Sequence, residues 1–555
     1  MLPKPPAPQS PAPLRVTTRL GTPSRLRAAF SLRTEARRRG MPTAELAGQM
    51  AENTGREAEP GGSDRTLNRR QLLTTAGALA AASAIPGGLL SPSRANAATA
   101  PRVVVVGAGL AGLRAAHQLW TGPKHIAATV YEADTSHIGG RCWSLRGFFN
   151  NGQVHEHGGS FISSSDSQIL ALAQRFHVDT ELANAGLLPD GDFLAWVNNA
   201  PYNTFDADLG AYIDAIGASY QAMGSPRYNN YTAEALRLDR MSCLDYMAEI
   251  GIDSRSPLGQ LMQTFQLQGG GEPADSSAVG LVGFWGSGAF GGDTFDELYH
   301  FKGGNDQIVS GMVGELPPGT VKQGYELVAV KRNTNGSYTC TFNRSGSLVD
   351  VVADHLILAL PFRMLRNVDL SCAGLTPRKT TAIAQQGMGH NAKLVLQLGH
   401  KTWPAAGSNG VTNTGPDGYQ SAWDGSVDLG ATGSPALLVN FPGGNTARYR
   451  YTGAAHGPAP SADINFFLNQ IENLLPGTRA AWNGKAYEDH WSVDPWHYGA
   501  YHYYRIGQYT AFSGYEGVQE GRIHFAGEHT DVDNATLNSA VASGERAATE
   551  VAAQI

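Results

Sequence analysis

The feature that most constrains this chain is a glycine-rich turn set between a short strand and a helix near residue 110. The four consecutive valines at 103–106 are typical of a buried parallel strand. They run directly into Gly-Ala-Gly-Leu-Ala-Gly at 107–112, which is followed by apolar residues at helical spacing. A second strand pattern at 128–132 ends in Glu132, 20 residues after Gly112. This order predicts the start of a parallel α/β sheet.

The residue types in this unit suit a bound dinucleotide. Gly107 permits the tight turn, Gly109 lets the backbone approach a pyrophosphate, and Gly112 lets helix and strand pack closely. The start of the helix offers free N–H groups and the positive end of its dipole to the phosphates. Glu132 can accept hydrogen bonds from ribose hydroxyls. The candidate binding residues here are Gly107, Gly109, Leu110, Ala111, Gly112, Glu132 and Ala133.

Charge is distributed unevenly along the 555 residues. The formal net charge is −6, but residues 1–40 carry +8 and residues 41–97 balance at zero, so residues 98–555 carry −14. A nucleic-acid-binding domain normally carries its excess positive charge where it can neutralise phosphates. Here that charge lies only in the N-terminal tail, so we expect no nucleic-acid partner.

The first hundred residues have the composition of a tail and a leader. Residues 1–67 are rich in Pro, Arg, Ser and Gly and are expected to be disordered. Residues 68–97 combine Arg69-Arg70, an uncharged Ala-rich run and a small-residue cleavage pattern before Ala98. This segment resembles a bacterial twin-arginine export signal, which implies export to the periplasm or outside the cell, folded around a cofactor.

A membrane anchor is the alternative for the leader, because its uncharged run at 71–90 is 20 residues long. That run contains Pro86, Gly87 and Gly88 and is only mildly apolar, so we expect no stable anchor. Met41 and Met50 are alternative starts of the chain, and cleavage of the signal stays open.

A second turn, Gly139-Gly140-Arg141, follows the first unit. Together they resemble the extended fingerprint of the flavin-containing amine oxidase family, in which this turn wraps the pyrophosphate of FAD. The resemblance implies that Gly140 and Arg141 bind the pyrophosphate, with Arg141 as its cation. Residues 156–161 are similar to the family's acid-x-Gly-Gly segment beside the flavin. They add the candidates Gly158, Gly159 and Ser160.

The resemblance continues in the middle of the chain. Residues 326–330 are typical of a strand, and Val328 takes the position whose backbone meets the adenine in the family. Period-two patterns at 338–342 and 349–351, separated by Ser345-Gly346, predict a β-meander.

The C-terminal motif is the most specific part of the resemblance. Residues 523–530 (Ile-His-Phe-Ala-Gly-Glu-His-Thr) are similar to the family's closing flavin motif. They imply that Gly527 and Glu528 bind FAD, with Glu528 facing its ribityl–pyrophosphate portion. A helix starting near Leu537 would aim backbone N–H groups at the flavin's pyrimidine carbonyl, where reduced flavin gathers negative charge.

These motifs lie roughly four hundred residues apart, so the cofactor domain must be assembled from several segments. The predicted fold is α/β: a Rossmann-like FAD-binding domain of the two-dinucleotide-binding type, plus an α+β substrate domain. The FAD domain is expected to comprise 98–177, 296–372 and 488–555, and the substrate domain 178–295 and 373–487.

The reaction implied by the resemblance is oxidative deamination of a small-molecule amine. A hydride passes to flavin N5, water hydrolyses the imine, and oxygen reoxidises the flavin to give hydrogen peroxide. Lys393, on a predicted strand, resembles the family lysine that holds a water against N5. Tyr501 matches one wall of the aromatic cage that flanks the amine, although a plain core aromatic is an open alternative.

Two positions depart from the family pattern. Mitochondrial monoamine oxidases attach the flavin through a cysteine where this chain has Ala500, so we expect non-covalent FAD. The second cage wall would fall at Thr536, which leaves the cage incomplete. We therefore expect a residue from the insertions to complete it.

Three rival functions stay open. An L-amino-acid oxidase of the same fold needs a cation for the carboxylate, but Ser160-Phe161-Ile162 stand where typical members have Arg. A desaturase acting on an isoprenoid or a porphyrin would want a membrane-facing patch, and no amphipathic anchoring stretch is evident. Lys393 and the closing motif argue against a non-catalytic FAD-binding protein.

Other site types lack support in the sequence. The sixteen histidines show no metal-binding spacing, so no metal is expected. The four cysteines have no short paired spacing, which excludes a disulfide scaffold. The oligomeric state is left open.

Overall fold

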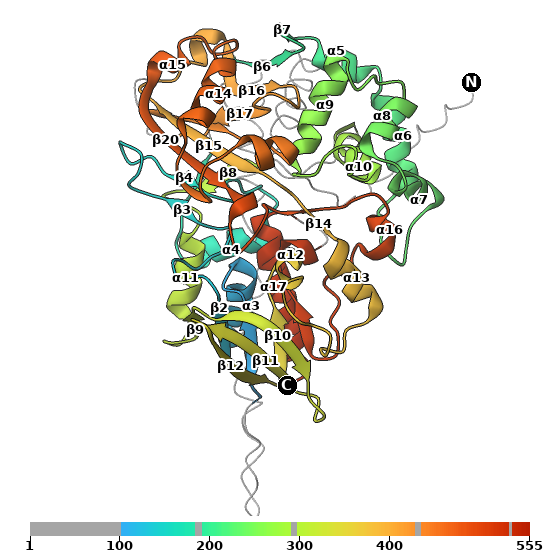
Figure 1. Cartoon of the computed structure of the whole chain (residues 1–555), viewed down its shortest axis with the longest axis vertical. Helices are drawn as coiled ribbons and strands as arrows, with labels where there is room; N and C mark the ends of the chain where they lie inside the picture. Colours follow the sequence, from blue (N-terminus) through green and yellow to red (C-terminus); the bar gives the residue numbers. More distant parts are fainter. Residues whose placement is uncertain (1–100, 184–190, 290–296, 428–434, 532–534) are drawn as a thin grey trace, which may run out of the picture. The chain divides into compact units, whose positions relative to one another are not determined.

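The computed structural model describes residues 101–183, 191–289, 297–427, 435–531 and 535–555, so the predicted tail and leader lie outside the described residues. A five-stranded sheet, in the order β22-β13-β1-β2-β9, lies at the centre of the predicted cofactor domain (Figure 1). Its strands are β1 (Val103–Val106), β2 (Ala128–Glu132), β9 (Val321–Gln323), β13 (His355–Leu358) and β22 (Ile523–Phe525). All of its pairings are parallel. The predicted assembly from distant segments is therefore confirmed.

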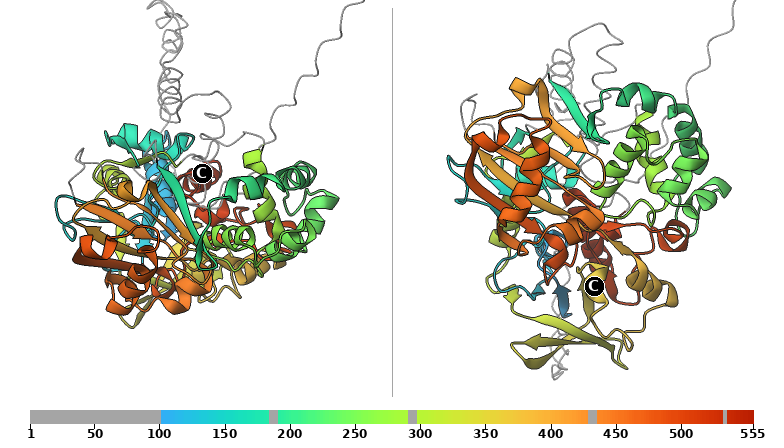
Figure 2. Two further views of the ribbon diagram at one scale, coloured as in Figure 1. Left: turned by 90° about the horizontal axis from the view of Figure 1, so that it is seen from above. Right: turned by 45° about the horizontal axis from the view of Figure 1, so that its top comes forward.

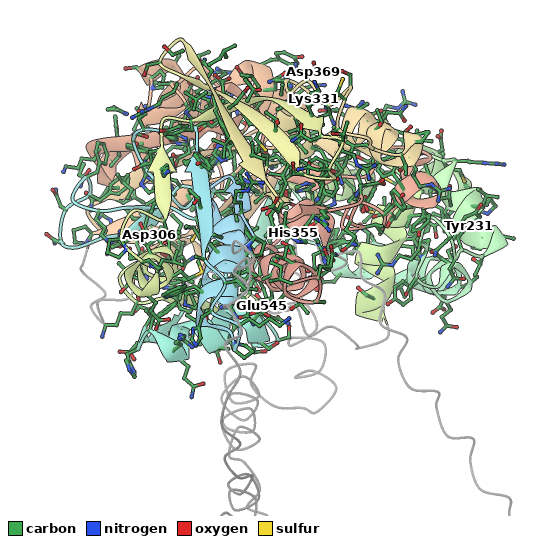
Figure 3. All side chains as sticks on the ribbon, turned by 90° about the horizontal axis from the view of Figure 1, so that it is seen from below. Tyr231, Asp306, Lys331, His355, Asp369 and Glu545 are labelled. Carbon is green, nitrogen blue, oxygen red and sulfur yellow. The ribbon has the colours of Figure 1, made fainter. Side chains whose placement is uncertain are left out.

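Both faces of this sheet are covered, which explains the uninterrupted valines of β1. Alternate valines pack against α3 (Leu110–Thr121) and α17 (Leu537–Ala552), and the others face the core under the meander. Helix α11 (Gln307–Glu315) packs beside α3. Glu545 of α17, labelled in Figure 3, accepts a hydrogen bond of 2.6 Å from Arg114 of α3.

The predicted meander is confirmed as β10 (Glu326–Arg332), β11 (Tyr338–Arg344) and β12 (Ser347–Ala353). Its second turn consists of Ser345 and Gly346, whose φ angles of 51° and 87° suit a tight hairpin. Figure 3 shows Lys331 and Asp369 on the outer side of this sheet.

The second large sheet has eight strands in the order β19-β20-β15-β18-β17-β16-β6-β7. The strands are β6 (Asp192–Val197), β7 (Ala200–Pro201), β15 (Ala392–Leu398), β16 (Ser408–Thr414), β17 (Ser421–Asp424), β18 (Ala436–Asn440), β19 (His456–Pro458) and β20 (Trp482–His490). Only β6 and β16 pair in parallel among these described strands. Helix α14 (Ser461–Ile471) packs on β15.

A group of helices lies beside this sheet, as the two views of Figure 2 show. They are α5 (Phe205–Gly210), α6 (Ile213–Met223), α7 (Ala233–Asp239), α8 (Cys243–Glu249), α9 (Pro257–Gln268) and α10 (Ala278–Ala289). Sheet and helices together form the α+β region that was predicted to bind the substrate. Strand β20 crosses the predicted boundary at residue 487; the domain limits themselves stay predictions.

The other α-helices and strands are short. They are β3 (Ser144–Leu145), β4 (His155–Glu156), α4 (Ser167–Arg175), β5 (Thr180–Leu182), β8 (Tyr299–Phe301), α12 (Phe362–Leu365), α13 (Pro377–Gln385), β14 (Gly387–Met388), α15 (Thr478–Ala481), β21 (His502–Tyr503) and α16 (Gln508–Phe512). In the described part of the chain, no helix combines the length and the apolar character that crossing a membrane requires.

Candidate active site

One cavity begins at the carboxyl ends of the parallel strands, the usual ligand position in such sheets. Residues within two positions of the ends of β1, β13 and β22 contribute to its wall. The predicted site residues that line it are Gly107, Gly109, Leu110, Ala111, Glu132, Gly140, Arg141, Gly158, Gly159, Ser160, Lys393, Tyr501, Gly527, Glu528 and Leu537. Segments far apart in the sequence thus meet around one space.

Two glycines of the first turn are required by close packing. Gly107 has φ +100°, and a Cβ there would lie 2.8 Å from the carbonyl oxygen of Ala359. A Cβ on Gly112 would lie 2.0 Å from the carbonyl oxygen of Gly107, so no side chain fits. Gly112 is not in the cavity wall, and its place between helix and turn matches its predicted packing role.

Glu132 is held rigidly at the end of β2. Its carboxylate accepts hydrogen bonds from the backbone N–H groups of Ala108 (2.6 Å) and Asp134 (2.9 Å). Ala133 and Val328 do not line the cavity. The carbonyl of Val328 accepts a bond from the N–H of Asp369. The adenine contact predicted for Val328 stays a prediction.

Arg141 and Glu528 form an ion pair in the cavity wall. Nη1 of Arg141 donates to Glu528 (2.9 Å) and to the carbonyl of Ala500 (2.6 Å). Glu528 also accepts a bond of 2.8 Å from His502. Burial disfavours its charge, but Arg141 and His502 outweigh burial and lower the pKa of Glu528. Because both Arg141 bonds use Nη1, the guanidinium keeps further N–H groups for an anion.

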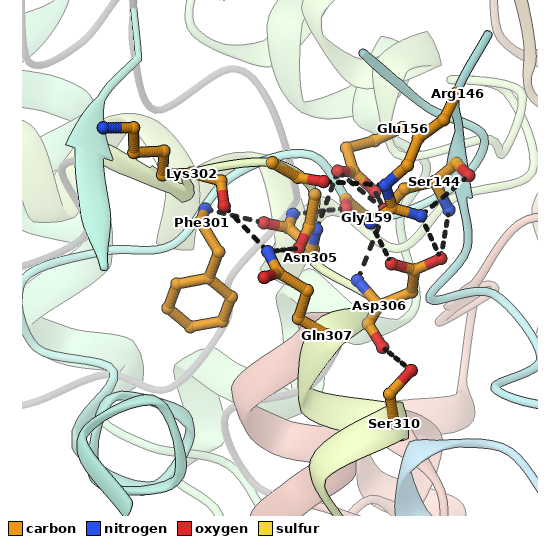
Figure 4. Close-up of polar contacts among 12 residues, drawn as sticks. Ser144, Arg146, Glu156, Gly159, Phe301, Lys302, Asn305, Asp306, Gln307 and Ser310 are labelled. Atoms are coloured by element: carbon orange, nitrogen blue, oxygen red, sulfur yellow. Dashed lines mark hydrogen bonds and ion pairs between the residues drawn. The ribbon is translucent and has the colours of Figure 1, made fainter. Parts of the chain in front are cut away.

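A buried acid fixes the segment that contains Gly158 to Ser160. Glu156 accepts hydrogen bonds from the Ser144 hydroxyl (2.8 Å) and the Asn305 N–H (2.8 Å), as Figure 4 shows. The Asn305 side chain donates in turn to the carbonyls of Gly159 (3.0 Å) and Ser160 (3.2 Å). Burial raises the pKa of Glu156. This network sets the backbone of the cavity wall.

Lys393 lies on β15, the strand that was predicted for it, and only 4% of it is exposed. Its Nζ donates to the carbonyls of Glu156 (2.8 Å) and Gly158 and to the Ser160 hydroxyl (2.7 Å). Burial lowers the pKa of Lys393, although nearby carboxylates oppose the shift. A protonated Lys393 thus uses all three N–H groups to clamp this segment. To hold a water as predicted, it must release one acceptor or lose its proton.

Aromatic side chains form another part of the wall. Trp423 contacts Phe161 and Phe441, with ring centroids 5.8 and 5.4 Å apart. Tyr501 lines the cavity with them, and its hydroxyl donates to the carbonyl of Gln268. Trp423 and Phe441 come from the second predicted insertion. The sequence had suggested that an insertion would supply such residues, but no motif marked them.

The two departures from the family pattern have structural consequences. Thr536 is the N-cap of α17, and its hydroxyl accepts a bond of 3.0 Å from the N–H of Ser539. Ala500 lines the cavity without a thiol. Of the described cysteines, only Cys142 is in the wall, and burial raises the pKa of its thiol. A protonated thiol is a poor nucleophile for attaching a flavin.

Charged groups in the wall bear on the substrate. Glu297 lines the cavity and is 6% exposed. Among the described lining residues, Arg141 and Lys393 are the only arginine and lysine, and both bind protein groups. The remaining N–H groups of Arg141 face the turn predicted to wrap the pyrophosphate, and Lys393 donates to three protein oxygens, so the described wall holds no arginine dedicated to a substrate carboxylate.

Sequence reasoning missed the polar cluster behind this wall. His157, His456 and Asp489 place nitrogen and oxygen atoms within 4.8 Å of one another, the only grouping of metal-ligating residues in the described chain. The His157–Asp489 and His456–Asp489 separations of 2.6 and 2.7 Å are hydrogen-bond lengths. Hydrogen bonding therefore accounts for the cluster.

The fold and the site define an oxidoreductase that binds a dinucleotide cofactor at the edge of a parallel sheet. A family model described as flavin containing amine oxidoreductase matches residues 110–552. The chain belongs to this family, and FAD is its cofactor.

Curated relatives and solved structures agree with this membership. A nicotine dehydrogenase of Pseudomonas putida is 24% identical over 81% of this chain and 88% of its own length. An L-amino-acid oxidase of Siganus canaliculatus is 23% identical over 82% and 85%. Cyclohexylamine oxidase from Brevibacterium oxydans superposes with a TM-score of 0.69 at 19% identity, covering 82% of this chain and 99% of that one. A putrescine oxidase bound to putrescine gives 0.68 at 21%, with the same coverage.

Proposed function

We propose that this protein is an exported oxidase that uses FAD to oxidise a small cationic amine, with oxygen as the electron acceptor. One observation carries the proposal: a single cavity joins the glycine-rich edge of the parallel sheet to a wall of aromatic residues, with Lys393 in the same wall. Arg141 is the only arginine among the described lining residues, and we assign its remaining N–H groups to the pyrophosphate, which favours an amine over an amino acid as the substrate.

The residues around the cavity fit FAD. A Cβ at Gly109 would meet only one atom within 4 Å, the Gly139 carbonyl oxygen at 3.9 Å, so the turn is open to a ligand. Helix α3 has no acid in its first turn to oppose phosphate binding. Arg141 suits the pyrophosphate and Glu132 the ribose. When bound, FAD accepts the hydride lost from the carbon next to the amine nitrogen, and water hydrolyses the resulting imine.

The chain's own residues bind and orient the amine. Trp423, Phe441 and Tyr501 contact its carbon skeleton and exclude water. An apolar surrounding lowers the pKa of the amine and so favours the unprotonated form that reacts. The net charge of −14 on residues 98–555 favours encounter with the cationic form of the amine. Lys393 holds the segment from Glu156 to Ser160 against the site.

A second candidate is oxidation of an L-amino acid, because several relatives are named L-amino-acid oxidases. It needs a cation for the substrate carboxylate, which here would require Arg141 to turn its remaining N–H groups away from the pyrophosphate or Lys393 to release a protein partner.

The cofactor and the acceptor are tested together on the purified protein. Acid precipitation should leave an intact yellow flavin in solution, which also tests non-covalent attachment. Aeration of the amine-reduced protein should yield hydrogen peroxide. A flavin retained in the precipitate contradicts non-covalent binding, and reoxidation that needs a dye instead of oxygen contradicts the oxidase assignment.

Export is tested separately by cell fractionation. Conservative replacement of both Arg69 and Arg70 by Lys should trap the protein in the cytoplasm, because the twin-arginine pathway reads that pair. Arg65→Lys, four residues upstream, is the matched control. Unchanged export of the double variant would refute the assignment of the leader.

A further inference from the structure

Behind the cavity wall, one buried carboxylate is surrounded by imidazoles. Asp489 of β20 accepts hydrogen bonds from His155 (3.0 Å), His157 (2.6 Å) and His456 (2.7 Å). Strand pairing creates the last contact, because His456 of β19 lies opposite Asp489 in the register of the sheet. Asp489 is fully buried, so its charge depends on these donors.

His456 links this carboxylate to a second one. Its Nδ1 faces Asp489 at 2.7 Å and its Nε2 faces Asp494 at 3.0 Å. A neutral imidazole has one N–H, so His456 can donate to both acids only as the imidazolium. Burial lowers the pKa of His456, but hydrogen bonds to the two acids outweigh it and raise the pKa to about 9.

Asp494 in turn orients His497, which lines the cavity. Oδ1 of Asp494 accepts from His497 Nδ1 (2.9 Å) and from the backbone N–H of Trp496 (2.7 Å). Because Nδ1 is committed, Nε2 is the atom left for a ligand. It points to the second glycine turn: a Cβ on Gly140 would lie 3.6 Å from it. No hydrogen bond from Nε2 to another described residue is present.

A pyrophosphate at this turn would place His497 between two acceptors. Nδ1 already faces the Asp494 carboxylate, so the ring can donate to a second anion only through an N–H at Nε2. Arg141, the cation of that turn, is shared with Glu528.

We propose that His497 is a cofactor-binding residue: it donates its Nε2–H to the pyrophosphate of FAD, and Asp494, His456 and Asp489 fix the orientation of its ring. The inference rests on FAD occupying this cavity. His456 and Asp489 are positioning residues, because they act only through Asp494 and His497.

The test measures binding of FAD to the apoprotein, with flavin fluorescence as the readout. His497→Gln removes the imidazole and should weaken the affinity for FAD about tenfold to a hundredfold, the range for one charge-assisted hydrogen bond. Asp494→Asn should weaken it by less, because His497 remains. The matched control is His390→Gln. His390 forms a hydrogen bond with Ser492, five residues before His497, but it does not line the cavity. The affinity of this variant for FAD should therefore stay within twofold of the unaltered protein.

Phosphorus NMR of bound FAD distinguishes direct contact from a purely structural role, because a structural role would leave the chemical shifts of the pyrophosphate unchanged. The pyrophosphate signals should shift in His497→Gln and Asp494→Asn and stay in place in His390→Gln. Unchanged affinity and unchanged signals in His497→Gln overturn the proposal. If His497→Gln does not fold, the spectrum of Asp494→Asn replaces it: shifted pyrophosphate signals support the proposal, and unshifted signals overturn it. Failure of the unaltered protein to bind FAD would refute the cofactor assignment instead.

Discussion

The two ends of the cavity are built in different ways. At the cofactor end, the wall consists largely of backbone: glycine turns, strand ends and the first residues of α3 and α17. At the amine end, it consists of side chains that single strands and loops contribute, among them Trp423, Phe441 and Tyr501. Backbone geometry tolerates few residues at each position, whereas a side-chain wall can be changed one residue at a time. Substitutions at the cofactor end should therefore impair FAD binding and folding, whereas substitutions at the amine end should change amine binding alone.

The largest effect is expected from a substitution at the cofactor end. Gly112→Ala places a Cβ 2.0 Å from the Gly107 carbonyl oxygen, so the turn or the helix must move. We expect loss of bound FAD and a lower melting temperature, measured by flavin absorbance and by thermal denaturation. Gly210→Ala in α5 is the control, because a Cβ there meets no atom within 4 Å. Normal FAD content in Gly112→Ala would show that the turn is not needed.

Lys393 lines the same cavity, and its replacement should mainly lower the rate of flavin reduction. Lys393→Met removes the donor that Glu156, Gly158 and Ser160 share. Flavin reduction by the amine should slow by about two orders of magnitude, as is typical when a positioned polar catalytic group is removed. Anaerobic stopped-flow measures this rate. Lys331→Met, on the outer side of the meander, should match the unaltered protein; a similar loss in both variants would exclude a specific role.

At the amine end, Trp423→Ala should change substrate binding without changing the cofactor. Loss of this aromatic contact is expected to raise KM for the amine about tenfold. This corresponds to about 1.4 kcal/mol of binding free energy, as expected when part of one ring is no longer buried against the amine. The affinity for FAD should stay the same. Steady-state kinetics measure KM for the amine, and flavin titration measures the affinity for FAD. If Trp423→Ala weakened the binding of FAD as much as that of the amine, the two ends would not act separately.

The last prediction concerns the pH dependence of stability. The pKa of His456 is about 9 in the folded protein, above its ordinary value near 6.5. Its contribution is therefore complete below pH 6.5 and is lost as the pH rises through 9, at most about 3 kcal/mol. Melting temperatures from pH 6 to 10 should fall more for the unaltered protein than for His456→Gln. Parallel curves would contradict the charged state of His456.

The contrast between the two ends also explains how much the sequence could predict. The glycines at 107–112, the acid at 132 and the motif at 523–530 are local patterns that backbone geometry imposes, so the cofactor end and its parallel sheet were predictable. Trp423 and Phe441 follow no local pattern, because only their packing across strands brings them together. The pairing of His456 with Asp489 depends on the register of β19 and β20, which the sequence does not encode locally.

Central to the proposed function is that an amine held by the aromatic wall, with no carboxylate of its own, reduces FAD in this cavity. The most direct measurement is anaerobic bleaching of the flavin by a matched pair, an arylalkylamine and the L-amino acid that differs from it only by the α-carboxylate. We predict rapid bleaching by the amine and slow or no bleaching by the amino acid. Bleaching by the amino acid alone would contradict the claim and assign the protein to L-amino-acid oxidation.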